Sequence, residues 1–147
     1  MPDKTKHARN QLLDAIVGLI DDNGVSVERS RVWPNEKEGY PRYFVFWTGE
    51  TIDWSQSTRD GTMRFMEVTV EAARQIATDG DVESAMQIDL RYLEEALTLP
   101  DIDGVVDAML ERIELSIHHQ GDIPLAVATL TLMVQYRTLP GKADILV

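Results

Sequence analysis

The chain has 147 residues and carries 14 Lys and Arg against 25 Asp and Glu, a formal charge of -11. This length fits a single domain that buries a sizeable core, and the lack of cysteine excludes disulfides, thiolate zinc sites and a cysteine nucleophile. The acidic balance argues against sequence-specific or general nucleic-acid binding, because phosphate contacts are made by Lys and Arg. No stretch approaches the roughly 18 to 20 apolar residues of a membrane span, so we expect neither a membrane segment nor a secretory signal.

The first forty residues predict a helix, a strand and a loop. Apolar residues between Leu12 and Ile20 recur with helical spacing, which predicts an amphipathic helix over residues 5–22 that Asn23-Gly24 closes. Residues 25–33 predict a first strand, which ends because Pro34 cannot donate to a ladder. The polar stretch 34–41, bracketed by prolines, predicts a loop.

The middle of the chain predicts two more strands and a second loop. The aromatic run 43–47 is apolar on both faces, which predicts a strand in the middle of a sheet with Trp47 in the core. Residues 49–61 predict a loop, and the alternation over 65–71 predicts a third strand.

The second half predicts a helix and a hairpin. A helical stripe runs over residues 82–97 after an acidic N-cap, and a short helical turn is expected at 103–110. Alternating residues 112–118 and 125–137 flank a Gly-containing turn and predict a β-hairpin. We expect one domain over residues 1–137 and a mobile C-terminal tail at 138–147.

The order helix, three strands, helix, hairpin groups the strands together. It predicts an α+β fold with a mostly antiparallel sheet of about five strands packed against two main helices.

The chain offers little that resembles catalytic or metal-binding chemistry. His118 and His119 are neighbours on a predicted strand and point to opposite faces, so they do not suit one metal ion. Asp101-Ile102-Asp103-Gly104 opens like a calcium loop, but its glycine comes too early, and acidic residues at a helix start explain it. Nucleophile elbows and phosphate-binding glycine loops are lacking. We therefore expect no catalytic residue, no metal and no cofactor.

Two stretches carry a resemblance to a known family. Residues 41–50 read Pro-Arg-Tyr-Phe-Val-Phe-Trp-Thr-Gly-Glu, and residues 128–136 read Ala-Thr-Leu-Thr-Leu-Met-Val-Gln-Tyr. Together with the order of the flanking helices, they resemble the tail terminator family of long-tailed bacteriophages, typified by the lambda minor tail protein U. The resemblance covers most of residues 5–137, by pattern more than by identity.

The resemblance implies a non-enzymatic virion protein, assembled in the bacterial host cytoplasm and located at the head-proximal end of the tail. Members of the tail terminator family form a six-membered ring on the last ring of the tail tube, halt polymerisation and present the other side of the ring for head joining. The implied partners are further copies of the chain, the tail tube protein and the head-tail connector protein.

Exposed loops are the expected contacts with neighbouring subunits or the tube. Tyr40 and Trp54 are large rings in polar segments, and they either anchor another protein or fold back over the sheet edge. With Arg42 and Arg59 they form the candidate interface.

An acidic surface is the second candidate feature. Six times -11 gives a ring a formal charge of -66, and a negative passage would keep DNA from sticking. An ordinary solvated face is the other interpretation. The candidate residues are Glu94, Glu95, Asp101, Asp103, Asp107, Glu111 and Glu114.

Two alternatives to a tail terminator stay open. A head-side neck protein would complete the head instead of the tail. A small acidic enzyme or ligand-binding domain would instead show a closed pocket with paired carboxylates or His118.

Overall fold

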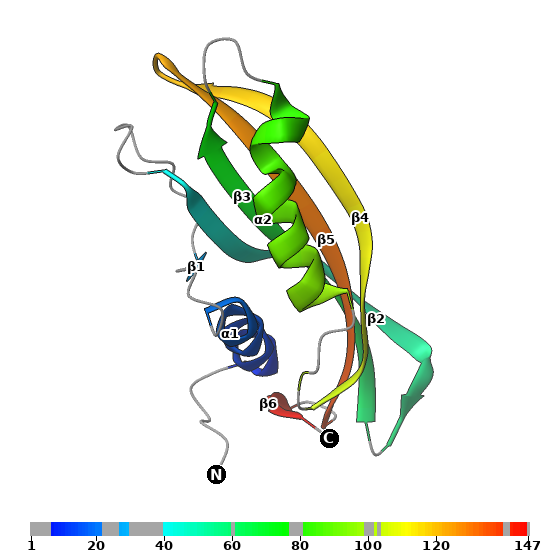
Figure 1. The fold of residues 1–147 in the computed structure, drawn as a ribbon. Helices are drawn as coiled ribbons and strands as arrows, with labels where there is room; N and C mark the ends of the chain where they lie inside the picture. Colours follow the sequence, from blue (N-terminus) through cyan, green and yellow to red (C-terminus); the bar gives the residue numbers. More distant parts are fainter. Residues whose placement is uncertain are drawn as a thin grey trace.

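One sheet carries two helices on one of its faces (Figure 1). The computed structural model describes residues 7–21, 27–29, 40–59, 61–76, 81–98, 102, 104–139 and 142–146. The elements follow one another as α1 (Ala8–Asp21), β1 (Val27–Glu28), β2 (Arg42–Thr58), β3 (Gly61–Gln75), α2 (Val82–Leu97), β4 (Val105–Gln120), β5 (Ile123–Leu139) and β6 (Lys142–Leu146). The predicted α+β fold, with a mostly antiparallel sheet and two main helices, is confirmed.

The sheet has β3 and β5 at its centre. The strand order is β1-β2-β3-β5-β4, and β6 also pairs with β5. Every pair is antiparallel except β1 with β2, which spans Val27–Glu28 in the described residues. The predicted hairpin of the second half is confirmed as β4 and β5, joined through Gly121, whose positive φ of 62° suits glycine.

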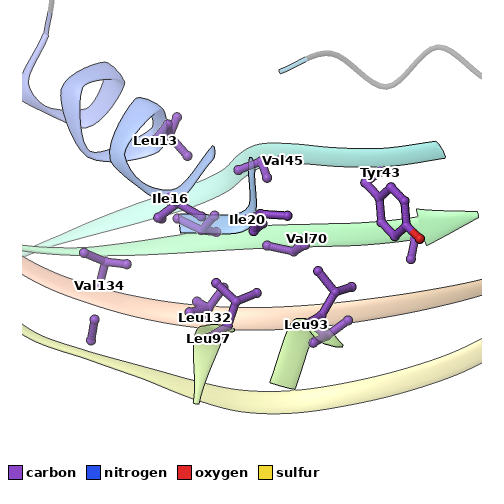
Figure 2. Packing of buried hydrophobic residues seen from close by; sticks show 14 of the residues in the cluster. Leu13, Ile16, Ile20, Tyr43, Val45, Val70, Leu93, Leu97, Leu132 and Val134 are labelled. Carbon is purple, nitrogen blue, oxygen red and sulfur yellow. The ribbon is translucent and has the colours of Figure 1, made fainter. Parts of the chain in front are cut away.

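The main core fills the space between the helices and the sheet. Both helices and alternate residues of β5 enter one buried cluster, as expected for amphipathic helices packed on one face of a sheet. Figure 2 shows Ile16 and Ile20 from α1 beside Val45 of β2, and Leu93 and Leu97 from α2 near Leu132 of β5. Each fully buried side chain of this size contributes roughly 1.5–3 kcal/mol to stability.

The opposite side of the sheet, called here the open face, carries neither helix. Cross-strand partners share a face, so the odd-numbered residues of β5 and their partners lie on it. At one end of this face Ala73, Ile123, Leu125 and Val127 form a small second cluster, against which Tyr40 packs.

A buried carboxylate on α2 ties that helix to the sheet. Asp89 accepts hydrogen bonds from the Tyr43 hydroxyl and from two nitrogens of Arg74, at 2.6 and 3.0 Å for the latter. Burial and the bond to this carboxylate raise the pKa of Tyr43 to about 12.

A second buried carboxylate, Glu50 of β2, joins three other elements. It accepts a hydrogen bond from the Tyr136 hydroxyl, lies 3.0 Å from Arg64 of β3, and lies 3.7 Å from Arg9 of α1. Burial, then the bond to Glu50, raises the pKa of Tyr136. The guanidinium of Arg9 also stacks 4.0 Å from the centre of the Trp47 ring, so polar contacts fix α1 as well as α2.

Residues 49–61 were expected to form a loop, and this prediction is wrong. β2 continues through Thr58 and pairs with β3, with irregularities after Trp47 and after Asp53. Much of residues 49–59 is exposed to solvent, and most of their side chains are polar. This segment therefore lacks the apolar alternation by which a half-buried strand is recognised in a sequence.

Three further expectations need correction. The run 43–47 does not lie in the middle of the sheet, and Trp47 is 44% exposed because β2 lies next to the short β1. The helical turn expected at 103–110 is instead the start of β4, which pairs with β5 from Val105 onward. A mobile tail was expected from residue 138, but Thr138 is buried in β5, and residues 142–146 pair with that strand as β6.

Other predicted elements are found in part. The helix predicted at 82–97 is confirmed as α2, and the helix predicted at 5–22 is confirmed over Ala8–Asp21. Of the strand predicted at 25–33, β1 covers Val27–Glu28. Most of the loop predicted at 34–41 lies outside the described residues.

Candidate assembly surface

The paired ends of β2 and β3, residues 49–59 and 61–65, are called here the arm. The strands pair from Gly49 with Glu67 down to Asp53 with Met63, and then Thr58 with Gly61. Figure 1 shows the end of β2 leaving the rest of the sheet at the lower right. Residues 54–59 lie beyond the last regular pairing and are called the tip.

Hydrogen bonds hold the tip in a defined shape. The Asp53 carboxylate accepts from the Ser55 backbone N–H at 3.0 Å, from the Ser55 hydroxyl at 2.6 Å and from the Gln56 amide at 2.8 Å. The Ser57 hydroxyl donates to the Asp53 carbonyl at 2.7 Å and accepts from the Met63 N–H at 3.0 Å. The bonds from Ser55 and Gln56 lower the pKa of Asp53. Asp53 thus acts as a turn-forming residue rather than as a titrating one.

The tip presents one large apolar ring and one cation to solvent. Trp54 is 73% exposed. Arg59 is also exposed and makes no hydrogen bond or ion pair within the part of the chain that the structure describes. A fixed, exposed Trp beside an Arg has the composition of a binding hot spot.

An open hollow of about 560 Å³ lies beside the arm, mainly on the open face. The register places Thr51, Phe65, Gln135 and Asp107 in one row across four strands. Met133 and Met109 face each other in the next row.

The lining of this hollow mixes apolar and acidic groups. Phe65, Met109 and Met133 supply the apolar surface, and Asp53, Asp107 and Glu111 supply carboxylates. The register of β4 shifts between Leu110 and Arg112, so Glu111 is an extra residue at a bulge.

The outer strand β4 exposes apolar side chains on both faces of the sheet. Met109 pairs with Met133 on the open face, whereas Ile113, Leu115 and Ile117 pair with Leu130, Ala128 and Ala126 and lie on the side of the helices. In the described residues β4 pairs with β5 alone, so its other edge carries no strand. Its sequence contains neither Lys nor Pro, the residues that often protect such an edge. The exposed apolar residues are Val106, Met109, Ile113, Leu115 and Ile117, the last at 57% exposure.

The four candidate interface residues do not form one cluster. Tyr40 packs against the second apolar cluster, and its pKa is raised by burial. Arg42 begins β2 and pairs with Glu28. Trp54 lies near the other end of β2, and Arg59 directly follows that strand. At about 3.3 Å per residue of strand, Trp54 is roughly 40 Å from Arg42. The exposed part of the predicted interface is therefore the tip.

The candidate acidic residues are likewise divided. Asp107 and Glu111 line the hollow, and Glu114 lies farther along β4, where it pairs with Arg112 at 2.6 Å. Glu94 and Glu95 belong to α2, on the other side of the sheet. Asp101 and Asp103 lie outside the described residues.

Several residues of the surface were missed by the sequence analysis. Phe65 and Met133 fall on the faces of their strands opposite the apolar alternation, so their spacing did not single them out, and the pairing of β3, β5 and β4 brings them and Met109 together. Met109 also fell inside the incorrectly predicted helical turn.

The described residues show neither a metal-binding cluster nor a membrane-spanning helix. In residues 7–146, apart from the gaps given above, the structure contains no group of three or more His, Asp or Glu side chains arranged to hold a metal ion. Neither described helix combines the length and the apolar character that a membrane crossing needs.

Comparisons with known proteins give a likeness to solved structures and no match to a known family. No protein-family model and no curated protein matches the sequence. A chain in the solved structure of the virion of a native gene transfer agent particle is similar to this chain. The two share 15% sequence identity with a TM-score of 0.48, over 86% of this chain and 90% of that chain.

Proposed function

We propose that this chain is a structural virion protein that forms a ring on the end of a growing phage tail tube. The ring ends polymerisation and provides the surface to which the head is joined. Its partners are other copies of the chain, the tail tube protein and the head-tail connector protein. The proposal assigns no catalytic step to the chain.

The observation that carries this proposal is the exposed apolar edge of β4. Five apolar side chains on a strand with one free edge in the described residues are a liability for a protein that stays alone in solution. A permanent contact with another chain removes that liability. The sequence resemblance to tail terminators supplies the kind of assembly in which such a contact occurs.

The arm supports a side-to-side contact between unlike surfaces. The tip and the edge of β4 differ in shape and chemistry, so a contact between them is heterologous. Heterologous contacts close into a ring when the rotation per subunit allows it, and otherwise continue as a filament. A ring that closes leaves no free lateral surface, so no further copy of the chain adds to it.

Purified protein incubated separately with isolated tails and isolated heads tests the proposal. We expect the protein to bind the ends of tails in electron micrographs and to prevent further addition of tube protein. Binding to heads alone would reject tail termination in favour of a head-side neck protein. Failure to bind either particle would reject a role in joining them.

Native mass measured across protein concentration tests the ring separately. We expect subunits to add up to one closed assembly, whose size does not increase further. A chain that stays a monomer both alone and on tails would contradict the ring.

A further inference from the structure

The hollow beside the arm has a composition that selects for a particular kind of side chain. Phe65, Met109 and Met133 favour an aromatic ring, since methionine sulfur and aromatic edges both pack well against one. Asp107 and Glu111 are exposed carboxylates, which favour a guanidinium beside that ring. An aromatic residue accompanied by Arg therefore complements the hollow in shape and charge.

The chain itself presents this combination on the tip. Trp54 and Arg59 are exposed there, while hydrogen bonds around Asp53 fix the backbone between them. A fixed tip loses little conformational entropy when it binds.

The tip does not fill the hollow of its own chain. Trp54 would be buried if its ring lay against Met109 and Met133, but it is 73% exposed. The same hydrogen bonds that order the tip hold it in this outward position.

We propose that the hollow receives the tip of a second copy of this chain, an inference that rests on the proposed ring. The indole of Trp54 lies against Phe65, Met109 and Met133, and the guanidinium of Arg59 pairs with Asp107 and Glu111.

Each copy then has one tip and one hollow, which are made by different residues. A contact of this kind links copies head to tail, as a ring requires. Two copies that exchanged tips reciprocally would instead form a closed dimer, which native mass distinguishes from a ring.

Crosslinking of single-cysteine variants tests the contact, and the absence of natural cysteines makes it clean. One chain carries Thr58→Cys on the tip and the other carries Gln135→Cys in the hollow. The matched control replaces the second variant with Gln87→Cys, an exposed position on α2 on the other side of the sheet. Neither chain can crosslink within itself, so a short bismaleimide reports contacts between chains.

We expect the tip and hollow pair to crosslink at least tenfold faster than the tip and control pair. Adding Trp54→Ala to the tip-bearing chain should reduce the rate to the control level, with an unchanged far-UV circular dichroism spectrum. Equal rates for hollow and control, or a rate that Trp54→Ala leaves unchanged, would overturn the inference.

A mixing experiment supplies an independent test. Trp54→Ala removes the tip contact and Met109→Glu removes the hollow contact, so each variant alone should stay monomeric. Their equimolar mixture retains one intact tip and one intact hollow per pair, and it should form dimers that cannot grow. A mixture that stays monomeric would also overturn the inference.

The inference and the proposed function can fail separately. If the tip and hollow crosslink but tails stay uncapped, the contact stands and the tail function falls. If tails are capped by rings although tip and hollow do not crosslink, the function stands and this contact is wrong.

Discussion

Replacement of Glu50 by alanine should destabilise the domain more than any exposed charge does. The Glu50 side chain is 9% exposed and is held by Tyr136, Arg64 and Arg9. Its removal leaves the Tyr136 hydroxyl without its acceptor and Arg64 without its carboxylate. Breaking a buried ion pair in this way costs about 3–5 kcal/mol. Arg64 keeps the hydroxyl of Thr138 at 3.0 Å, so we expect the lower end, about 3 kcal/mol.

Urea denaturation followed by circular dichroism measures this loss. For a domain of this size a loss of about 3 kcal/mol corresponds to a fall of roughly 6–12 °C in Tm. The matched control is Glu95→Ala, which removes a 3.3 Å ion pair with Arg91 between two exposed side chains on α2. This control should cost no more than about 0.5 kcal/mol.

A double-mutant cycle identifies the source of the loss. Combining Glu50→Ala with Arg64→Ala should cost less than the two single losses together, because the second substitution removes the unpaired charge. Strictly additive losses, or a loss for Glu50→Ala no larger than that of Glu95→Ala, would refute the assignment of Glu50 as the buried partner of Arg64.

Three further outcomes follow from the structure. The pKa of Tyr43 is raised to about 12, so the folded state holds this proton more tightly than the unfolded state; its stabilisation is complete below pH 10 and is lost as the pH rises towards 12. Urea midpoints at pH 9 and pH 11 should therefore differ less in Tyr43→Phe than in the wild type, and an equal difference would exclude this role of the hydroxyl. Asp81 caps α2 by accepting the Ser84 N–H at 2.8 Å, so Asp81→Ala should lower the stability of the domain at pH 7. The same bond lowers the pKa of Asp81 from its ordinary 3.8, so the stabilisation by this carboxylate is lost as the pH falls through its pKa in the folded state. The difference in Tm between wild type and Asp81→Ala should therefore be smaller in acid than at pH 7, and a constant difference would contradict the capping role. Ile117→Lys on the exposed edge of β4 should weaken self-association while changing stability by no more than about 0.5 kcal/mol; sedimentation velocity measures the association, and unchanged association would exclude this edge as a contact.

The helices and the final hairpin could be predicted because their burial follows simple periods. Residues 82–97 carry a helical stripe, and α2 has those bounds. Alternate residues of β5 from Ala126 to Tyr136 are fully buried, as their spacing of two indicated. In both cases one face packs against the core and the other does not, so apolar residues recur with the repeat of the helix or the strand itself.

The arm could not be predicted because its strand pairing does not depend on burying its side chains. Residues 49–53 and Thr58 pair through their backbones with β3, while most of their side chains are polar. Trp47 was misplaced for a related reason. The sequence of a strand does not reveal whether its neighbour is long or short, and here β1 covers β2 over Val27–Glu28 in the described residues.

The candidate interface was predicted in part, through the chemistry of Trp54 and Arg59. The hollow was not, since it depends on a row that joins Thr51, Phe65, Gln135 and Asp107 from four strands. Such a row is set by register and by the bulges of β4, which a single sequence does not specify.

The tip is organised by hydrogen bonds of its own and not by the core. Asp53 and Ser57 order it through contacts that stay within the hairpin, and Trp54, at 73% exposure, contributes little buried surface to the domain. Natural variation at the exposed positions of the tip is therefore nearly neutral for folding. The residues that the tip presents to solvent can therefore change during evolution while the scaffold beneath stays the same.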